Sequence, residues 1–178
     1  MKIRIVLIAV LFVLSVGCNS NKEQDKPIDL TKLVKVTLTA TVEKNDSFQL
    51  FYKEEDNANK LYEENNSIWV DVKASDLPQE IQFLLPENVL PNYLRLDLGI
   101  NNTHKNMKIS GLTISYLDKK VNMTSGTFFE TYFIPNNCIQ VEDKGAGLIK
   151  LQKDEAGTYD PIFNSGENLK FELQRIYK

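Results

Sequence analysis

The sequence predicts an all-β protein, an antiparallel β-sandwich of the jelly-roll type with about nine or ten strands. Several segments alternate apolar and polar residues with a period of two, as half-buried strands do. These segments are short and are divided by turns rich in Gly, Asn and Asp, and no long stretch beyond the N-terminal apolar segment has helical periodicity. With 178 residues, 42% of them hydrophobic and 25% charged, the chain suits a single globular domain.

The clearest alternation is in residues 34–42, VKVTLTATV, where aliphatic residues alternate with Lys and Thr. Asn45 and Asp46 follow, and both residue types tolerate the positive φ of a tight hairpin turn. Residues 47–53, SFQLFYK, then predict the returning strand of a hairpin. Its two faces carry Phe48, Leu50 and Tyr52 on one side, and Gln49, Phe51 and Lys53 on the other.

A polar, acidic loop at 54–66 precedes three further predicted strands, at 67–73, 80–86 and 93–99. In the first of these, Trp69 alternates with the aliphatic positions and therefore shares a face with Ser67 and Asp71. In the last, Arg95 and Asp97 lie opposite the leucines. Two residues on the same face are roughly 7 Å apart at their bases, so these two can form a surface ion pair.

The alternation in residues 107–116, MKISGLTISY, changes parity at Gly111, which predicts a β-bulge. The remaining predicted strands are 126–134 (GTFFETYFI), 138–141 (CIQV), 147–152 (GLIKLQ), 158–163 (TYDPIF) and 169–176 (LKFELQRI).

The N-terminus has the features of a secretory signal. Lys2 and Arg4 precede an apolar run from Ile5 to Val16, which is shorter than the roughly 20 residues that span a bilayer. Residues 14–18, LSVGC, resemble the lipobox of bacterial lipoproteins. The resemblance implies that Cys18 is acylated and becomes the mature N-terminus; the alternative is an ordinary cleaved signal peptide.

The organisation that follows is a signal peptide at 1–17, a lipidated cysteine and polar tether at 18–32, and a single sandwich domain at 33–178. The chain from Cys18 keeps 19 basic and 24 acidic side chains, a formal charge of −5. This negative net charge provides no basic surface for nucleic-acid binding and does not favour binding to anionic lipid headgroups. Asn19 is not the aspartate that retains some lipoproteins in the inner membrane, which favours the outer membrane, on its periplasmic side or at the surface.

Few residues suggest catalysis or metal binding. The one histidine, His104, lies in a polar stretch and is expected to be a solvated loop residue. The acidic residues Glu54, Glu55, Asp56, Glu63 and Glu64 are more typical of a soluble loop than of a glycosidase pair. Cys138 is expected to be buried, and Asp143, Asp154 and Asp160 are weak calcium candidates. We therefore expect no enzyme activity, no bound metal and no cofactor.

The polar faces of the strands are more informative. An aromatic side chain among polar groups can stack on a sugar ring while its neighbours bond the hydroxyls. If instead another segment covers this face, Trp69 is simply part of the core. The candidate ligand-binding residues are Trp69, Phe51, Gln49, Asp71, Arg95 and Asp97.

Residues 79–117 contain the segments QEIQFLLPENVLPNYLRLDLGINN and MKISGLTISYLD. They resemble the last strands of jelly-roll carbohydrate-binding modules of the galactose-binding-like superfamily. The resemblance implies a sandwich fold and sugar binding, and it transfers no binding residue.

Together these features predict a membrane-anchored, non-catalytic envelope protein that binds a glycan or another envelope component through a sheet face. The alternative is an assembly lipoprotein that holds a protein partner through a sheet or its edge.

Overall fold

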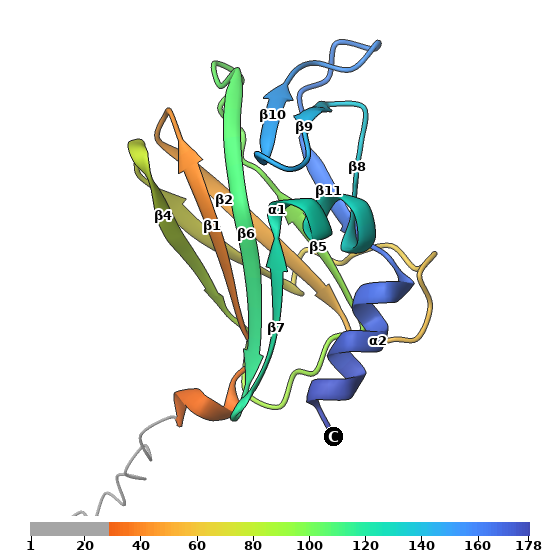
Figure 1. The fold of residues 1–178 in the computed structure, drawn as a ribbon. Helices are drawn as coiled ribbons and strands as arrows, with labels where there is room; N and C mark the ends of the chain where they lie inside the picture. Colours follow the sequence, from red (N-terminus) through yellow and green to blue (C-terminus); the bar gives the residue numbers. More distant parts are fainter. Residues whose placement is uncertain (1–28) are drawn as a thin grey trace, which may run out of the picture.

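The computed structural model describes residues 29–178, which form two antiparallel sheets packed face to face (Figure 1). The prediction of an antiparallel β-sandwich is confirmed, with eleven strands rather than nine or ten. The predicted signal peptide and Cys18 lie outside the described residues. Among residues 29–178, no helix has both the length and the apolar character needed to cross a membrane.

The six-stranded sheet has the order β4-β1-β6-β10-β9, and β7 pairs with β6 beyond the end of β10. The chain enters it through a short 3-10 turn, η1 (Leu30–Lys32), within the predicted tether. Its strands are β1 (Lys35–Val42), β4 (Ser75–Leu84), β6 (Asn106–Tyr116), β7 (Lys119–Thr124), β9 (Ile139–Asp143) and β10 (Leu148–Leu151).

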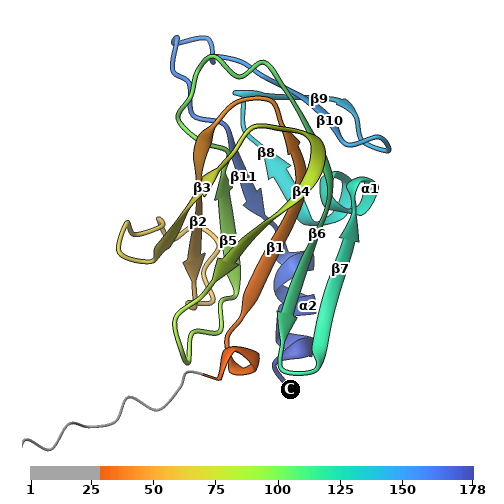
Figure 2. The ribbon, with the colours of Figure 1, turned by 90° about the vertical axis from the view of Figure 1, so that its left-hand side faces the viewer.

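The five-stranded sheet has the order β3-β2-β5-β11-β8 (Figure 2). Its inner face buries large apolar side chains, including Phe48, Leu50, Leu94 and Leu96, against those of the other sheet. Its strands are β2 (Asp46–Lys53), β3 (Ser67–Val72), β5 (Tyr93–Asp97), β8 (Phe133–Pro135) and β11 (Ile162–Ser165).

The predicted hairpin between β1 and β2 is wrong, because the two strands belong to different sheets. β1 pairs with β4 and β6, whereas β2 pairs with β3 and β5. The connection is a corner between the sheets, and neither Asn45 nor Asp46 has a positive φ. The buried carboxylate of Asp46 instead accepts hydrogen bonds from the backbone N–H groups of Ile100 and Asn101, at 3.0 and 3.2 Å.

The predicted bulge is present in β6. Thr39 of β1 pairs with Gly111 and the next residue, Ala40, pairs with Ile109, so Ser110 is the extra residue. A Cβ atom added at Gly111 would lie 2.4 Å from the carbonyl oxygen of Met123 in β7. Glycine therefore allows β7 to approach β6 closely at this point.

The C-terminal segment is a helix, α2 (Glu167–Ile176), and not the predicted strand. The alternation of Leu169, Phe171 and Leu173 suggested a strand, but Phe171 is 69% exposed. The buried positions are Leu169, Leu173 and Ile176, whose spacing of four and three residues is that of a helix. α2 packs between β7 of one sheet and β5 and β11 of the other (Figure 1).

The predicted strand at 126–134 is also largely wrong. It contains the end of a short turn, α1 (Ser125–Thr127), a single wide helical turn, η2 (Phe128–Tyr132), and the start of β8. Phe128 and Phe129 are adjacent and both buried, which two faces of one half-buried strand do not allow.

Candidate functional site

All six predicted ligand-binding residues lie on one face of the five-stranded sheet. Gln49 of β2 is paired with Trp69 of β3 on one side and with Asp97 of β5 on the other. Because the neighbouring residues of these strands point into the core, this face is the outer one. We call it the polar face and define it by Gln49, Phe51, Trp69, Asp71, Arg95 and Asp97.

A second row of the same face runs through Phe51. It is paired with Ser67 of β3 and with Arg95 of β5, and Arg95 is in turn paired with Asn164 of β11. The strand order therefore joins the aromatic residues and the Arg–Asp pair, although they come from three separate strands.

Arg95 and Asp97 form a two-point ion pair. The Nε of Arg95 donates to Oδ1 of Asp97 at 2.8 Å, and a second guanidinium N–H donates to the other carboxylate oxygen. The guanidinium carbon lies 4.3 Å from the centre of the Phe51 ring, a cation–π arrangement. The pair is only partly exposed, at 25% for Arg95 and 13% for Asp97.

The acidic loop at 54–66, which we call the strap, covers part of the polar face. Tyr62 of the strap meets the Phe51 ring edge to face, with 6.1 Å between ring centres. Phe51 is consequently only 4% exposed. The prediction of Phe51 as an open stacking platform is therefore wrong, because the strap, which directly follows β2, folds back over its ring.

Lys53, at the end of β2, holds the strap in place. Its ammonium group donates to the backbone carbonyl oxygens of Asn57, Ala58 and Lys60, at 3.2, 2.9 and 2.6 Å. It also lies 4.4 Å from the centre of the Tyr62 ring. Lys53 is only 3% exposed, and burial lowers its pKa. These contacts give a buried ammonium the partners that it requires.

The part of the polar face beyond the strap stays open. Trp69 is 50% exposed, so the alternative of a core tryptophan does not hold. Its strand neighbour Asp71 is also exposed and accepts a hydrogen bond from the hydroxyl of Ser47 at 2.6 Å. Gln49 is buried beside it and donates to Glu64 of the strap at 2.8 Å and to Ser67 at 2.9 Å.

A hollow of about 370 Å³ lies between the strap and the sheet. Arg95 forms part of its wall, and so the hollow is continuous with the polar face. The other lining residues are Ala58, Asn59, Lys60, Leu61, Tyr62, Ile162 and Asn164.

Burial shifts the pKa of two groups at this site. It raises the pKa of Asp97 above its usual value, although the hydrogen bonds from Arg95 act in the opposite direction. It also raises the pKa of the Tyr62 hydroxyl, which stays protonated at neutral pH.

His104 is fully buried, so the expectation of a solvated loop histidine is wrong. Its Nε2 lies 3.6 Å from Oδ2 of Asp46, and neither ring nitrogen has a hydrogen-bond partner among the described residues. A buried imidazole beside a carboxylate resembles two members of a catalytic triad, but His104 has no surface that a substrate can reach.

The carboxylates considered for catalysis have structural partners. Glu55 and Glu63 pair with Lys60, Asp56 pairs with Lys170 of α2, and Glu54 accepts from the backbone N–H of Leu90 at 2.9 Å.

Two of the three aspartates considered for calcium also have partners. Asp143 and Asp154 each accept a backbone N–H within their own turn, both at 2.8 Å. Within residues 29–178, no three His, Cys, Asp or Glu side chains form a group that could hold a metal ion. Cys138 is buried, as expected.

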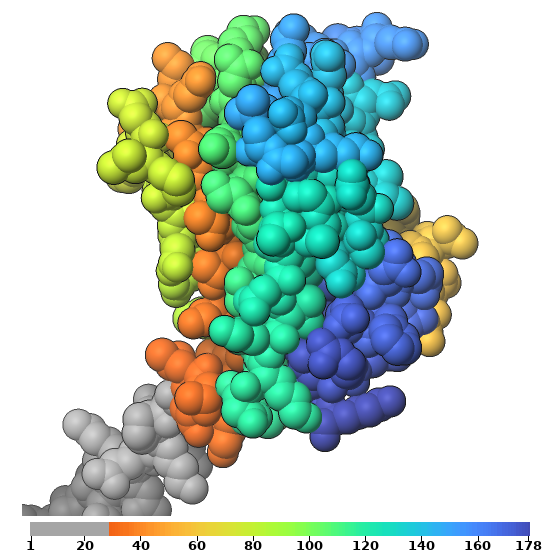
Figure 3. Space-filling view, in the orientation of Figure 1, coloured from red at the N-terminus to blue at the C-terminus, as the bar shows by residue number. Residues whose placement is uncertain are grey.

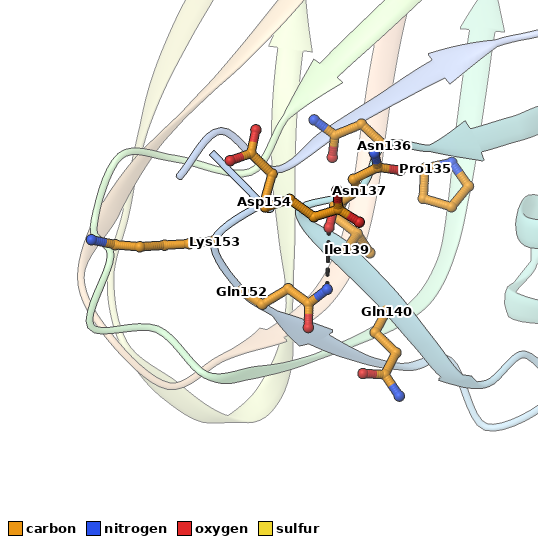
Figure 4. A pocket seen from close by; sticks show the side chains of 9 residues that line it. Pro135, Asn136, Asn137, Ile139, Gln140, Gln152, Lys153 and Asp154 are labelled. Carbon is orange, nitrogen blue, oxygen red and sulfur yellow. Dashed lines mark hydrogen bonds between the residues drawn. The ribbon is translucent and has the colours of Figure 1, made fainter. Parts of the chain in front are cut away.

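A larger hollow of about 690 Å³ lies between residues 135–140, which run from the end of β8 into β9, and the turn at 152–155 (Figure 4). Its amides stabilise those turns. Asn136 donates to the carbonyl oxygen of Asp160 at 2.6 Å, and Gln152 donates to that of Asn137 at 3.2 Å. Lys153 extends away from the other side chains. We therefore regard this hollow as a product of the turns.

The strap is a part of the site that the alternation of the strands does not predict. Tyr62, Glu64 and Lys53 now join the predicted residues. One signal was present: Tyr62 is an isolated aromatic residue in an otherwise polar loop, and such a side chain gains by packing against the domain. No family model, curated protein or solved structure matches this chain.

Proposed function

We propose that this chain is a lipid-anchored, non-catalytic protein of the cell envelope, in the outer membrane, that binds a glycan through the polar face. The observation that supports this most is the half-exposed Trp69 beside Gln49 and the Arg95–Asp97 pair. An exposed indole offers a flat apolar surface to one side of a sugar ring. Polar groups with fixed positions beside it offer directional bonds to the hydroxyls.

The strap adds a second element to this proposal. It stands above the sheet, so that a chain of sugars lying across Trp69 meets a wall at Glu64 and Tyr62. The hollow beside Arg95 then accommodates a substituent of the sugar. The polar groups are already held by hydrogen bonds, which reduces the entropy lost on binding.

Glycan-array screening and isothermal titration calorimetry test this function. A chain beginning at Asn19 is screened first, and each hit is titrated by calorimetry into the wild type and the variants, because Trp69 is the only tryptophan and its emission is lost in Trp69→Ala. We expect Trp69→Ala to weaken binding about tenfold, equivalent to about 1.4 kcal/mol. Leu77→Ala is the matched control, because Leu77 is 74% exposed on β4 of the other sheet. The absence of any glycan hit, or equal binding by both variants, would contradict the proposal.

The anchor is tested separately. Cells that express the full chain are grown with an alkyne-bearing fatty acid, and the protein is examined for incorporation of the label. We expect labelling of the wild-type chain and none of Cys18→Ser.

A second candidate function, binding of a protein partner, is favoured by the edge of the six-stranded sheet. β4 is ten residues long and pairs only with β1 among the described strands, and its Leu77 is exposed. Such an edge can pair with a strand of another chain. A photo-crosslinking residue at Gln79 should then capture one dominant protein in cells, whereas the same residue at Ser47 should not.

A further inference from the structure

The end of the sandwich at which the described chain begins carries two exposed leucines. Leu30 of η1 is 61% exposed, and Leu117, at the tip of the β6–β7 hairpin, is 52% exposed. The backbone N–H of Leu117 donates to the carbonyl oxygen of Thr31 at 2.9 Å. Both leucines line one shallow hollow of about 210 Å³. Figure 3 shows η1 and the hairpin tip side by side at this end.

The backbone of Leu117 is in the left-handed region, with a φ of 53°. This region is sterically unfavourable for a bulky residue, and Gly or Asn normally occupies such turn positions. A leucine here is therefore unfavourable for the turn and, being exposed, contributes little to the core. A strained residue that persists at the surface points to a role outside the fold.

Lysines surround the two leucines. Lys35 of β1 and Lys120 of β7 are both paired with Ser115 of β6, so the three residues form one row across the sheet. Lys32 and Lys119 are exposed next to the leucines in the chain. Asp29, which lies 3.9 Å from Lys32, and Asp118 are the acidic residues nearest to this group in the chain, and the exposed Glu87 follows Leu84, which is paired with Lys35. This end is thus locally basic, although the whole chain is acidic.

We propose that this end rests on an anionic lipid surface, that of the membrane to which the chain is anchored. We call it the basal patch and define it by Leu30, Leu117, Lys32, Lys35, Lys119 and Lys120. The leucines enter the boundary between headgroups and acyl chains, and the lysines contact the lipid phosphates. This inference rests on the lipid anchor of the proposed function.

Because the tether is short, a weakly binding basal patch is sufficient to keep the domain on the membrane surface. Ten residues lie between Cys18 and Asp29, so the eleven Cα–Cα steps span at most about 40 Å when fully extended. A domain held so close to a surface meets it at an effective concentration in the millimolar range. Each lysine near anionic lipid then favours the contact by roughly fivefold.

The test replaces the natural anchor, so that it does not depend on acylation. A chain that begins at Asn19 carries an N-terminal hexahistidine tag and is bound to vesicles of phosphatidylglycerol, phosphatidylcholine and a nickel-chelating lipid. Trp69→Phe removes the native tryptophan, and a new one is introduced at one position at a time. Quenching by dibrominated lipid then reports which position reaches the acyl region.

We expect Leu30→Trp and Leu117→Trp to lose at least half of their emission to the brominated lipid. Leu77→Trp is the matched control and should lose little. Leu77 is more exposed than either leucine but lies at the far end of the sandwich, since Ser75 is paired with Val42 while Lys35 begins β1 at the basal patch. Equal quenching at all three positions, or none at Leu30 and Leu117, would overturn the proposal.

Two further variants separate contact with lipid from a role in folding. Lys119→Glu with Lys120→Glu should reduce the quenching of Leu30→Trp at least twofold. Leu117→Gly should reduce that quenching as well, while it raises the urea concentration at the midpoint of unfolding because glycine tolerates the left-handed backbone. If Leu117→Gly instead lowers the midpoint and leaves quenching unchanged, Leu117 serves the fold and the proposal fails. Absence of fatty-acid labelling on Cys18 would contradict the natural anchor alone, because the tag supplies the tether here.

Discussion

Arg95 and Asp97 form an ion pair, and the groups around the pair determine its exposure and its geometry. On an open strand face such a pair contributes under about 1 kcal/mol. Here the Asp97 side chain is only 13% exposed, and the guanidinium lies over the ring of Phe51. The pair is therefore held in a fixed geometry, and its carboxylate has lost much of its water.

The raised pKa of Asp97 leads to a prediction about pH. Below pH 3.8, the ordinary value, Asp97 is protonated in both the folded and the unfolded chain. As the pH rises through the higher pKa of the folded state, ionisation costs more in the folded chain, so stability is lost. Asp97→Asn cannot ionise. We expect wild-type stability to fall relative to Asp97→Asn between pH 3.8 and 7.

Urea denaturation of both proteins at pH 3.5, 5 and 7 measures this difference in the free energy of unfolding. A difference that stays constant over the three pH values would show that burial does not raise the pKa of the Asp97 carboxyl.

The strap is the element that converts a flat strand face into a site with a wall. Lys53 holds the strap in place by donating to three of its carbonyl oxygens. Three carbonyl oxygens that converge without a cation between them would repel one another, so the ammonium group of Lys53 fixes the shape of the strap.

Lys53→Met keeps the aliphatic stem and removes these bonds. We expect a loss of about 1–3 kcal/mol in the free energy of unfolding, because three carbonyl oxygens lose their shared donor. The strap should also become much more sensitive to cleavage by a Glu-specific protease at residues 54–64. Lys150→Met, at an exposed position of β10, is the control and should change neither measurement. An intact strap in Lys53→Met would contradict this role.

The bulge in β6 makes a similar prediction for Gly111. Alanine there would place a methyl group 2.4 Å from the carbonyl oxygen of Met123, and backbone must move to relieve the contact. We expect Gly111→Ala to lower the free energy of unfolding by about 1–3 kcal/mol in urea denaturation. At Gly126 the nearest atom to an added methyl group is 3.9 Å away, so Gly126→Ala should not destabilise the protein.

At the scale of the whole molecule, α2 closes the gap between the two sheets. It buries Leu169, Leu173 and Ile176 against the common core, and it contacts β7 in one sheet and β5 and β11 in the other. α2 thus joins both sheets and closes the core between them.

Leu173→Ala tests this closure. Leu173 is fully buried, so we expect a loss of about 2–5 kcal/mol in thermal or urea unfolding, with one cooperative transition for both sheets. Phe171→Ala removes a larger side chain from the same helix but at a 69% exposed position, and it should change stability by less than about 0.5 kcal/mol. Comparable losses in the two variants would show that the helix packs differently.

The proposed polar face and basal patch lie on different sides of the molecule. The strands run lengthwise from the tether end (Figures 1 and 2). A domain that rests on the basal patch therefore stands upright on the membrane, with Trp69 and the strap on its flank and open to a glycan.

The sequence by itself determined most of the strand segments, the core-facing side of those with a clear alternation, and where β6 bulges, but it did not indicate β7. These features depend on local alternation, and the pleat of a strand converts it directly into faces. It also determined that Arg95 and Asp97 share a face, because they are two residues apart.

Only the tertiary structure decided the strand order, which places Trp69, Gln49 and Asp97 in one row. It also decided that the strap covers Phe51, that His104 is buried, and that the C-terminal segment is a helix. The strand order, the burial of His104 and the packing of α2 depend on contacts between residues that are far apart in the chain, and a period of two or of four residues carries no information about such partners. The strap directly follows β2, but it covers Phe51 only because it folds back over the sheet, which alternation does not reveal either.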